Sequence, residues 1–350
     1  MESTVEISPN SMRSRLNSVV SVASPPLHDT HFIWLEVTSH CQLECSHCYA
    51  ASGPSQGHGG VSADQWMQVL AEAATAGVQH VQFIGGEPTS HPALPRLITH
   101  ARQLGLSVEV FSNLFSIREH IWRAFALPGV SLATSYYSSS PYVHEQITQR
   151  VKSHERTRAN IVEAVRRGIP VRVGLIRFSE SQDVDIAIEE LTSIGVDRSA
   201  ISIDDQRRVG RGRGSFACTT ENELCGKCSD GVLALMPDGT VQPCVFSRDE
   251  RFKVGNIATE TLTSILEGER LHRMREYLSS VFEQRGIKGV DLPQDQPRGL
   301  QNCGPACSPA CSPVGNCNPV VNPPPCNPSA GHPPRPEPPT RPPGPVCAPY

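Results

Sequence analysis

The chain contains no apolar run long enough to cross a bilayer, and its Ser-rich start lacks the charged and apolar stretches of a signal peptide. Neither sign of charge dominates, since 31 Lys and Arg face 35 Asp and Glu for a formal net charge of −4. No basic stripe with interleaved aromatic residues is present, which argues against nucleic-acid binding. Cysteine is plentiful, however: 13 residues without an export signal indicate reduced thiols and metal ligands, not disulfides. We therefore expect a cytoplasmic protein with no membrane or nucleic-acid partner.

The 350 residues suffice for one large domain and one smaller domain. Residues 1–30 lack periodicity and predict a flexible lead-in. Residues 31–205 alternate strand-like and helix-like patterns and predict the large domain, and residues 206–326 carry most of the remaining cysteines. Residues 327–350 repeat Pro-Pro steps, which favour an extended polyproline-type tail.

Apolar runs alternate with amphipathic segments along the large domain. The expected strands are residues 32–37, 78–84, 107–111, 130–135, 171–176 and 200–203. The expected helices include residues 62–76, 92–104, 155–167 and 183–194. Ser62 and Gln65 have the spacing of a capping box at the first helix. Glycines at positions 77, 105, 168 and 195 each follow a helical segment, where a residue with a left-handed backbone is expected. This alternation predicts an α/β fold with a parallel sheet, whose functional site gathers at the carboxyl ends of the strands.

Three cysteines, Cys41, Cys45 and Cys48, directly follow the first expected strand at CxxxCxxC spacing. So short a loop can bend three thiolates towards one point, where they can hold three corners of a [4Fe–4S] cluster. With three protein ligands, one iron keeps an open coordination position. A substrate can bind there, as it does at the open position of a catalytic zinc ion. A zinc site is the alternative, with His40 or His47 as the fourth ligand.

The cysteine motif, the Tyr49 that follows it and Gly85-Gly86-Glu87-Pro88 after the second strand together resemble the radical S-adenosylmethionine (SAM) superfamily. The resemblance implies a partial (β/α)6 TIM-like barrel in which the open iron binds SAM. One electron then cleaves SAM to a 5′-deoxyadenosyl radical, which abstracts hydrogen from a substrate. It also implies that Gly85, Gly86 and Glu87 bind the SAM ammonium group, and we count Tyr49 among the cofactor-binding residues.

Further strand ends match family positions. Asn113 and Ser135, after the third and fourth strands, correspond to residues that contact SAM, although Leu114 stands where the family has glycine. A stretch with His144, Ile147 and Thr148 also resembles the family, and the resemblance implies that Arg150 pairs with the SAM carboxylate. A solvated surface arginine is the alternative.

A second cysteine region begins after residues 207–214, which resemble the Arg-x-x-Gly-Arg-Gly bridge of the family. Asp238-Gly239 between two apolar runs predicts a hairpin that brings Cys228 and Cys244 together. The arrangement resembles a SPASM or twitch domain, which implies one or two auxiliary [4Fe–4S] clusters. The candidate ligands are Cys218, Cys225, Cys228, Cys244, Cys303, Cys307, Cys311 and Cys317.

Alternatives remain open in this second region. Four cysteines with one CxxC can instead hold zinc. One of Cys218 or Cys225 can instead be a free thiol that returns a hydrogen atom to a substrate radical. Of the tail cysteines, only Cys311 and Cys317 keep the SPASM spacing, and a disordered Cys/Pro tail is the other interpretation.

The resemblances predict a radical SAM enzyme, oxidoreductase-like or peptide-modifying, that acts in natural-product or ribosomal-peptide maturation. Its partners would be SAM, a peptide or small-molecule substrate and an electron donor such as flavodoxin or ferredoxin. The Cys-rich tail favours a peptide, whereas residues 1–30 leave no room for a leader-recognition domain. The alternatives are a radical SAM epimerase or dehydrogenase of a sugar or aminocyclitol and, in another class, a non-catalytic iron–sulfur electron carrier or a zinc-binding module.

Overall fold

The computed structural model describes residues 29–179, 182, 184–214 and 220–285. Its strands form one sheet, in which the first six pair in parallel. They are β1 (Phe32–Glu36), β2 (His80–Ile84), β3 (Ser107–Phe111), β4 (Val130–Tyr136), β5 (Val171–Arg177), β6 (Ile201–Asp205), β7 (Val232–Leu235), β8 (Thr240–Gln242) and β9 (Gly255–Asn256). Their order across the sheet is β6-β5-β4-β3-β2-β1-β7-β8-β9.

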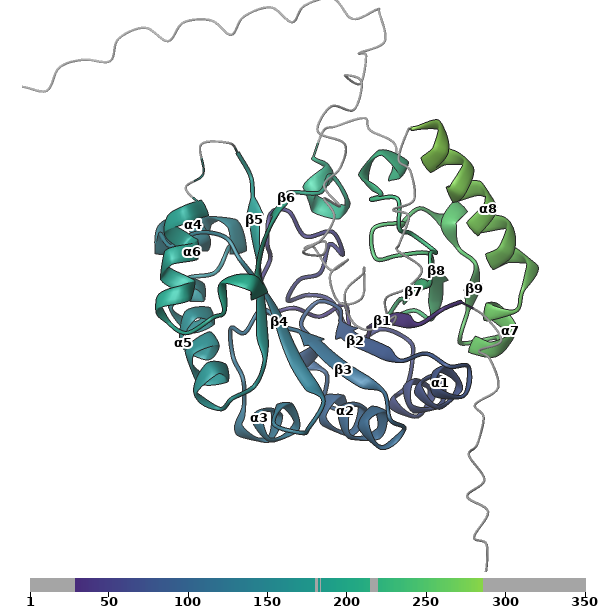
Figure 1. The fold of residues 1–350 in the computed structure, drawn as a ribbon, viewed down its shortest axis with the longest axis horizontal. Coiled ribbons are helices and arrows are strands. Elements are labelled where there is room, and N and C mark those ends of the chain that lie inside the picture. The colour runs from purple at the N-terminus through teal and green to yellow at the C-terminus, as the bar shows by residue number, and fades with distance from the viewer. Residues whose placement is uncertain (1–28, 180–181, 183, 215–219, 286–350) are drawn as a thin grey trace, which may run out of the picture.

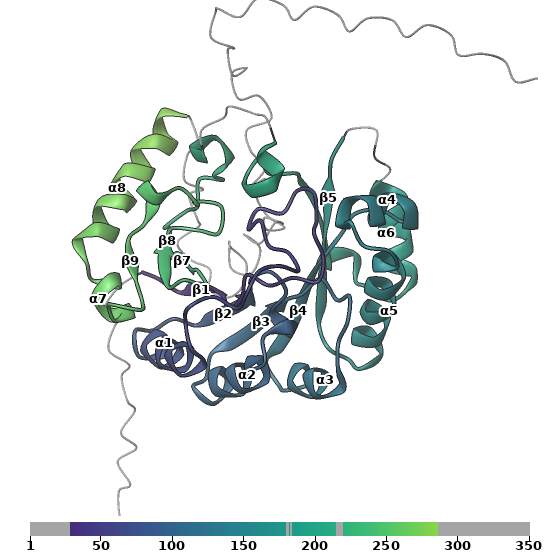
Figure 2. The ribbon, with the colours of Figure 1, turned by 180° about the vertical axis from the view of Figure 1, so that it is seen from behind.

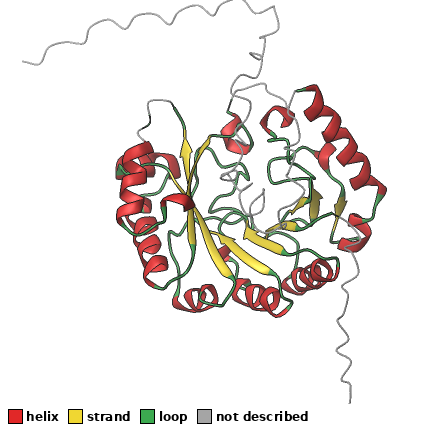
Figure 3. Ribbon diagram, in the orientation of Figure 1, coloured by secondary structure: helices red, strands yellow, loops and turns green. Residues whose placement is uncertain are grey.

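Helices cover the outer, convex side of the curved sheet, and the loops after the strands fill its concave side (Figures 1 and 2). They are α1 (Ala63–Thr75), α2 (Leu94–Gln103), α3 (Glu119–Phe125), α4 (Pro141–Thr148), α5 (Ser153–Arg166), α6 (Val184–Ser193), α7 (Leu262–Leu266) and α8 (Glu269–Gln284). Strands and helices alternate from β1 to β6, so the predicted α/β fold with a partial TIM-like barrel is confirmed (Figure 3). None of the described helices combines the length and the apolarity that a bilayer crossing requires.

Local signals placed most elements within a few residues. Ser62 caps α1, and Gln65 completes the predicted capping box. The glycines after four helices have the predicted left-handed backbone, at positions 77, 105, 168 and 195. The short helices α3 and α4 were not among the predicted segments. After β9 the chain forms two helices in succession, since α7 ends at Leu266 and Gly268 is the N-cap residue of α8.

Strand β1 is buried on both faces, because it lies near the middle of the sheet. Its alternate side chains enter two different cores. Ile33 and Leu35 pack with the helices of the convex side, whereas Phe32 and Trp34 pack with residues that follow the barrel, such as Val232. The same strand therefore joins the barrel to the second cysteine region.

The second region continues the barrel sheet. β7 pairs in parallel with β1, and β8 and β9 follow in antiparallel order. Gly239 has φ 87°, as the tight turn between β7 and β8 requires, so the predicted hairpin is confirmed. The predicted boundary at residue 206 thus separates two parts that share one sheet, and the boundaries themselves stay predictions.

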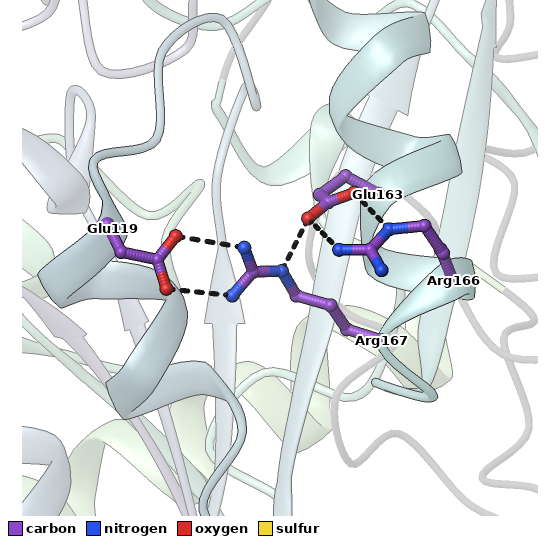
Figure 4. Close-up of polar contacts among 4 residues, drawn as sticks. All are labelled: Glu119, Glu163, Arg166 and Arg167. Carbon is purple, nitrogen blue, oxygen red and sulfur yellow. Dashed lines mark hydrogen bonds and ion pairs between the residues drawn. The ribbon is translucent and has the colours of Figure 1, made fainter.

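An exposed ion-pair network ties α3 to α5 on the convex side (Figure 4). Arg167 donates to Glu119 at 2.9 Å and to Glu163 at 2.6 Å, and Arg166 donates to Glu163 at 2.7 Å. Glu119 and Arg166 are exposed, and Glu163 and Arg167 are half-buried at the surface. Because solvent and salt reach these groups, the network orients the two helices and adds little stability.

Candidate active site

A cavity opens at the carboxyl ends of the strands, on the concave side of the sheet. Most of the predicted site residues of the barrel line it: Cys41, Cys45, Cys48, Tyr49, Gly85, Gly86, Asn113 and Ser135. Glu87 and Arg150 are not among its lining residues. The cavity therefore brings together the cysteine loop and the ends of the five strands β2 to β6, as expected for a parallel barrel.

The cysteine loop is held from outside by the end of α4. The Glu44 N–H donates to the carbonyl of Thr148 at 3.2 Å, and the Ser46 N–H donates to that of Ile147 at 2.9 Å. Carbonyls in the last turn of a helix have no partner within the helix, so they are free to accept these bonds. The stretch that resembled the family at residues 144–148 thus supports the cysteine loop through its backbone.

The bridge segment after β6 holds the loop from its other side. Arg211 donates to the carbonyl of Cys45 at 2.8 Å and to that of Ser52 at 2.7 Å, and its N–H donates to the carbonyl of Cys48 at 2.9 Å. A Cβ atom on Gly210 would overlap the carbonyl oxygen of Tyr49. Only glycine permits this approach, so the bridge and the cysteine loop form one rigid unit.

Gly85 and Gly86 allow the end of β2 to pack directly on the start of the cysteine loop. A Cβ atom on Gly85 would overlap the Thr38 carbonyl oxygen, and one on Gly86 would overlap that of His40. The Gly86 N–H donates to the Thr38 carbonyl at 2.7 Å. The two glycines therefore have a packing role, and their contact with the SAM ammonium group stays a prediction.

Glu87 is buried behind the cavity wall, and its carboxylate accepts hydrogen bonds from three residues. The donors include the Ser112 hydroxyl at 2.8 Å and the Asn113 N–H at 2.8 Å, both after β3. Burial raises the pKa of this carboxyl above its usual value. Glu87 therefore fixes the loop that presents Asn113, and its predicted contact with SAM stays a prediction.

Asn113 supports the cysteine loop directly. Its amide nitrogen lies 3.5 Å from Cys41 Sγ, and its amide oxygen accepts from Gln42 at 3.1 Å. Leu114, which replaces the family glycine, takes the left-handed conformation with φ 52° and is fully buried. The Ser112 hydroxyl accepts from its N–H and Asn160 donates to its carbonyl, so packing and hydrogen bonds hold a conformation that leucine rarely adopts.

Arg150 lies outside the cavity. Its side chain is exposed, and its guanidinium stands over the Phe115 ring at 5.5 Å from the centroid. The predicted ion pair with the SAM carboxylate is not prepared by this arrangement and stays a prediction.

Burial disfavours negative charge on Cys41 and Cys45 unless a metal compensates for it. Burial raises the pKa of the Cys41 thiol well above its usual value and that of Cys45 to about 12, and the neighbouring thiols add to both shifts. Three clustered thiolates in a desolvated site need a strong local positive charge, which coordinated iron supplies. The donor set therefore fits a [4Fe–4S] cluster held by Cys41, Cys45 and Cys48.

The second cysteine set lies behind one wall of the same cavity. Cys228 Sγ and Cys244 Sγ lie 3.0 Å apart, which confirms the predicted approach of the two hairpin ends. The closeness of Cys225 and Cys244 raises the pKa of the Cys228 thiol, so the three sulfurs form one group that fits a shared metal centre. The other predicted ligands, Cys218, Cys303, Cys307, Cys311 and Cys317, lie outside the described residues.

Within the described part of the chain, no three or more His, Cys, Asp or Glu side chains are placed to hold a single metal ion. A cubane cluster sets a different requirement, because each thiolate binds its own iron atom.

Aromatic and charged side chains separate the two cysteine sets. Tyr49 and Phe246 pack edge to face with centroids 5.2 Å apart, and the Arg207 guanidinium lies over Phe246 at 5.2 Å. Arg248 lies over Tyr49 at 5.0 Å and pairs with the buried Glu36. Tyr49 and Phe246 line the cavity and also pack with the second cysteine set, so that set lies directly behind these two rings.

Several lining residues were not among the predicted site residues: Phe111, Tyr137, Ile176, Asp205, Arg207 and Phe246. His47, which the sequence suggested only as a zinc ligand, also lines the cavity. His47 lies inside the cysteine motif, and its buried Nδ1 has no hydrogen-bond partner among the residues that the structure describes. Burial lowers the pKa of His47 to about 4, so the ring is neutral near pH 7. Its place in the motif was a usable signal, but the sequence did not show that the ring turns into the cavity wall.

A parallel barrel with three thiols on one loop at its strand ends, backed by a second thiol group, is an arrangement that suits two metal centres beside one cavity. Comparison with known families agrees. Residues 35–178 match the Radical SAM superfamily, and residues 220–290 match SPASM, an iron–sulfur cluster-binding domain. The chain thus combines a radical SAM domain with a SPASM domain. The first implies a [4Fe–4S] cluster and SAM, and the second implies auxiliary iron–sulfur clusters.

Among curated relatives, the PqqA peptide cyclase of Rhodopseudomonas palustris is 30% identical over 116 residues, or 33% of this chain and 31% of the relative. The sporulation killing factor maturation protein SkfB of Bacillus subtilis is 30% identical over 166 residues, or 46% of this chain and 39% of the relative. The chain therefore spans less than half of the length of either protein.

Among solved structures, Streptococcus suis SuiB bound to its precursor peptide SuiA superposes with a TM-score of 0.58. The two proteins share 14% sequence identity, and the superposition covers 70% of this chain and 66% of SuiB. This likeness shows that the fold is shared.

Proposed function

We propose that the protein is a radical SAM peptide maturase: it cleaves SAM reductively and uses the resulting radical to modify a ribosomal peptide. The observation that carries the proposal is the single cavity that Cys41, Cys45 and Cys48 share with Phe246 and Arg207, directly in front of Cys228 and Cys244. A substrate in this cavity lies between a site for radical formation and a second redox centre. We also propose that the protein works in the cytoplasm, where its thiols stay reduced.

When bound, the catalytic cluster and SAM supply a 5′-deoxyadenosyl radical that abstracts hydrogen. The protein contributes position and protection. Cys41, Cys45 and Cys48 would hold the cluster, while Arg211 and the end of α4 fix their loop. The Asn113 amide faces Cys41 Sγ and would stabilise negative charge on that sulfur. Because apolar residues such as Ile84 and Phe111 also line the cavity, water would be largely excluded from the radical.

The substrate side of the cavity carries one buried cation and one carboxylate. Arg207 is 5% exposed and donates to the Glu223 carbonyl at 2.8 Å, and Asp205 pairs with Arg177 at 2.7 Å. Groups fixed in this way can orient the amide and carboxylate groups of a peptide. The relatives' names, a peptide cyclase and a killing-factor maturation protein, favour a peptide over a sugar or aminocyclitol.

An anaerobic assay tests the proposal. The protein is reconstituted with iron and sulfide, then given dithionite and SAM, and 5′-deoxyadenosine is measured by liquid chromatography and mass spectrometry. We expect it to form. SAM that stays intact beside a reduced cluster would overturn the enzyme, and a colourless protein with bound zinc and no labile sulfide would identify a zinc-binding module.

A second assay tests the substrate class. Short cysteine-rich or repetitive peptides encoded beside the gene are incubated in D2O with the reconstituted enzyme. Loss of two hydrogens from the peptide indicates a cross-link, and uptake of one deuterium at an α-carbon indicates epimerisation. Cleavage of SAM with every such peptide left unchanged would contradict the peptide assignment and leave the radical chemistry standing.

A further inference from the structure

A basic surface lies over the outer side of the cysteine loop. Phe115 is buried and packs with Cys41 and Leu43, and Cys45 packs against the same group. Two guanidiniums stand over this ring, that of Arg156 at 4.7 Å from the centroid and that of Arg150 at 5.5 Å. One aromatic ring therefore separates two exposed cations from two of the proposed cluster ligands.

The cations of this surface differ from other cations nearby in their ion pairs, although the Glu145 carboxylate accepts a hydrogen bond from the Lys152 backbone N–H at 2.8 Å. Arg158, Arg166 and Arg167 at α5 each pair with a glutamate. Within the described ranges, by contrast, Arg150, Lys152 and Arg156 make no ion pair. Two guanidiniums over one ring repel each other, and an anionic partner would relieve that repulsion.

The loop that carries these cations has an unusual backbone. Gln149 and Lys152 are both left-handed, with φ 55° and 64°, although neither is glycine. Between them, Val151 is 75% exposed, the highest value among the large apolar side chains described. Strained residues that present an apolar side chain among arginines are typical of an interaction surface.

From these observations we propose that this surface, formed by Phe115, Arg150, Val151, Lys152 and Arg156, docks a small acidic one-electron carrier of the flavodoxin or ferredoxin kind. The reduced carrier would lose one electron and the catalytic cluster would gain it, passing from the 2+ to the 1+ state. This inference rests on the proposed function. None of the five residues lines the cavity, so a ligand here is neither SAM nor the reacting part of a substrate.

Charge reversal tests the docking surface. In Lys152→Glu with Arg156→Glu, Arg150 is left unchanged because its predicted contact with the SAM carboxylate would add a second effect to the measurement. The affinity for an acidic flavodoxin is measured anaerobically by titration calorimetry at low and high salt. We expect at least about tenfold weaker binding at low salt and a smaller salt dependence than in the unaltered protein.

Two matched variants complete the design. Lys152→Gln with Arg156→Gln removes charge without adding repulsion and should give an intermediate loss. Arg123→Glu with Arg198→Glu makes the same change of charge in the last turn of α3 and just before β6, at the opposite end of the barrel. The latter pair should leave binding unchanged, and equal weakening by both reversed pairs would overturn the proposal.

A second readout separates this proposal from the proposed function. The reversed variant should make 5′-deoxyadenosine at the unaltered rate with dithionite and at least about tenfold more slowly with reduced flavodoxin. Unchanged flavodoxin binding, or a loss of affinity for a precursor peptide in its place, would overturn the docking surface alone. Unaltered protein that binds flavodoxin but forms no 5′-deoxyadenosine with either reductant would overturn the proposed function instead.

Discussion

The two cysteine sets of this protein are built in different ways. Cys41, Cys45 and Cys48 lie on one short loop that is held by the end of α4, the end of β2 and Arg211. The second set joins Cys225 and Cys228, before β7, to Cys244, after β8, through a hairpin. Segments far away in the sequence thus hold the first set. The second set is held mainly by bonds near its own hairpin, such as the Ser229 N–H to the Pro243 carbonyl at 3.2 Å and the Cys244 N–H to the Ser247 hydroxyl at 3.0 Å.

The difference predicts how each set depends on its metal. Backbone hydrogen bonds that the protein supplies keep the catalytic loop in place without iron. The described thiols of the second set lie in mutual contact, so they gain more of their order from a shared metal. The following changes test this contrast, beginning with the largest expected effect.

Removal of one thiol from each set should separate two activities. Cys45→Ala should lower 5′-deoxyadenosine formation by at least about three orders of magnitude, because the cluster then lacks a ligand. Cys228→Ala should keep that activity within about tenfold but abolish peptide modification. Liquid chromatography and mass spectrometry follow both products, and iron and sulfide content follows the clusters. If the two variants lost SAM cleavage equally, the division of labour between the sets would be wrong.

Loss of the hydrogen bonds from Arg211 should affect the catalytic cysteine set and leave the second set unchanged. Arg211→Ala leaves the carbonyls of Cys45 and Ser52 without their guanidinium partner, and we expect about 10-fold to 100-fold slower SAM cleavage. Electron paramagnetic resonance should show a weakened catalytic cluster beside unchanged auxiliary clusters. Arg208→Ala, an exposed arginine of the same segment, is the control and should retain nearly full activity. Equal loss of both kinds of cluster would mean that Arg211 acts on the whole fold.

Acid should weaken the barrel more than the second region. Burial lowers the pKa of His47 and of His91 to about 4 and that of His144 to about 3, whereas the described histidine of the second region, His272, is exposed. Between pH 6.5 and 4 the unfolded chain binds protons that the folded barrel does not, so stability falls as pH falls. We expect a loss on the order of 2 kcal/mol from each buried ring.

His144→Phe tests this linkage. Phenylalanine keeps a ring against Tyr136 and Tyr137 and cannot be protonated. Urea unfolding of the metal-free protein at pH 7 and pH 5 should show a smaller difference for the variant than for the unaltered chain. Replacement of the exposed His272 by phenylalanine is the control and should leave the difference as it was. An unchanged pH dependence in His144→Phe would show that protonation of His144 does not contribute to the loss of stability in acid.

Much of the fold was predictable, because the signals that specify it act over few residues. The strand runs, the Ser62 capping box, the left-handed glycines after the helices and the Asp-Gly turn all appear in the structure. The short helices α3 and α4 escaped prediction, since at 7 and 8 residues they hold too few apolar positions for a helical period to stand out. β7 was expected in a separate domain. Its pairing with β1 requires a free edge of β1, and no local sequence pattern indicates which strand edges are free.

The site was predictable to the extent that motifs name residue types at strand ends. The cysteines, the two glycines, Asn113 and Ser135 all line the cavity. The direction of a long side chain was not predictable. The Glu87 carboxylate points into the cavity wall, where it bonds Ser112, and the Arg150 guanidinium lies outside the cavity over the Phe115 ring. Leu114 shows the same limit, because only its buried surroundings explain how leucine holds a left-handed backbone.

The sequence by itself determined the alternation of strands and helices, the three thiols on one loop and the hairpin that joins Cys228 to Cys244, because periodicity and turn chemistry act between near neighbours. The tertiary structure decided what supports those thiols. Arg211 reaches the carbonyl of Cys45 across 166 positions of sequence, and β7 pairs with β1 across a comparable distance. Such contacts depend on the curvature of the whole sheet. The distance between two residues on a curved sheet depends on the packing of every strand that lies between them.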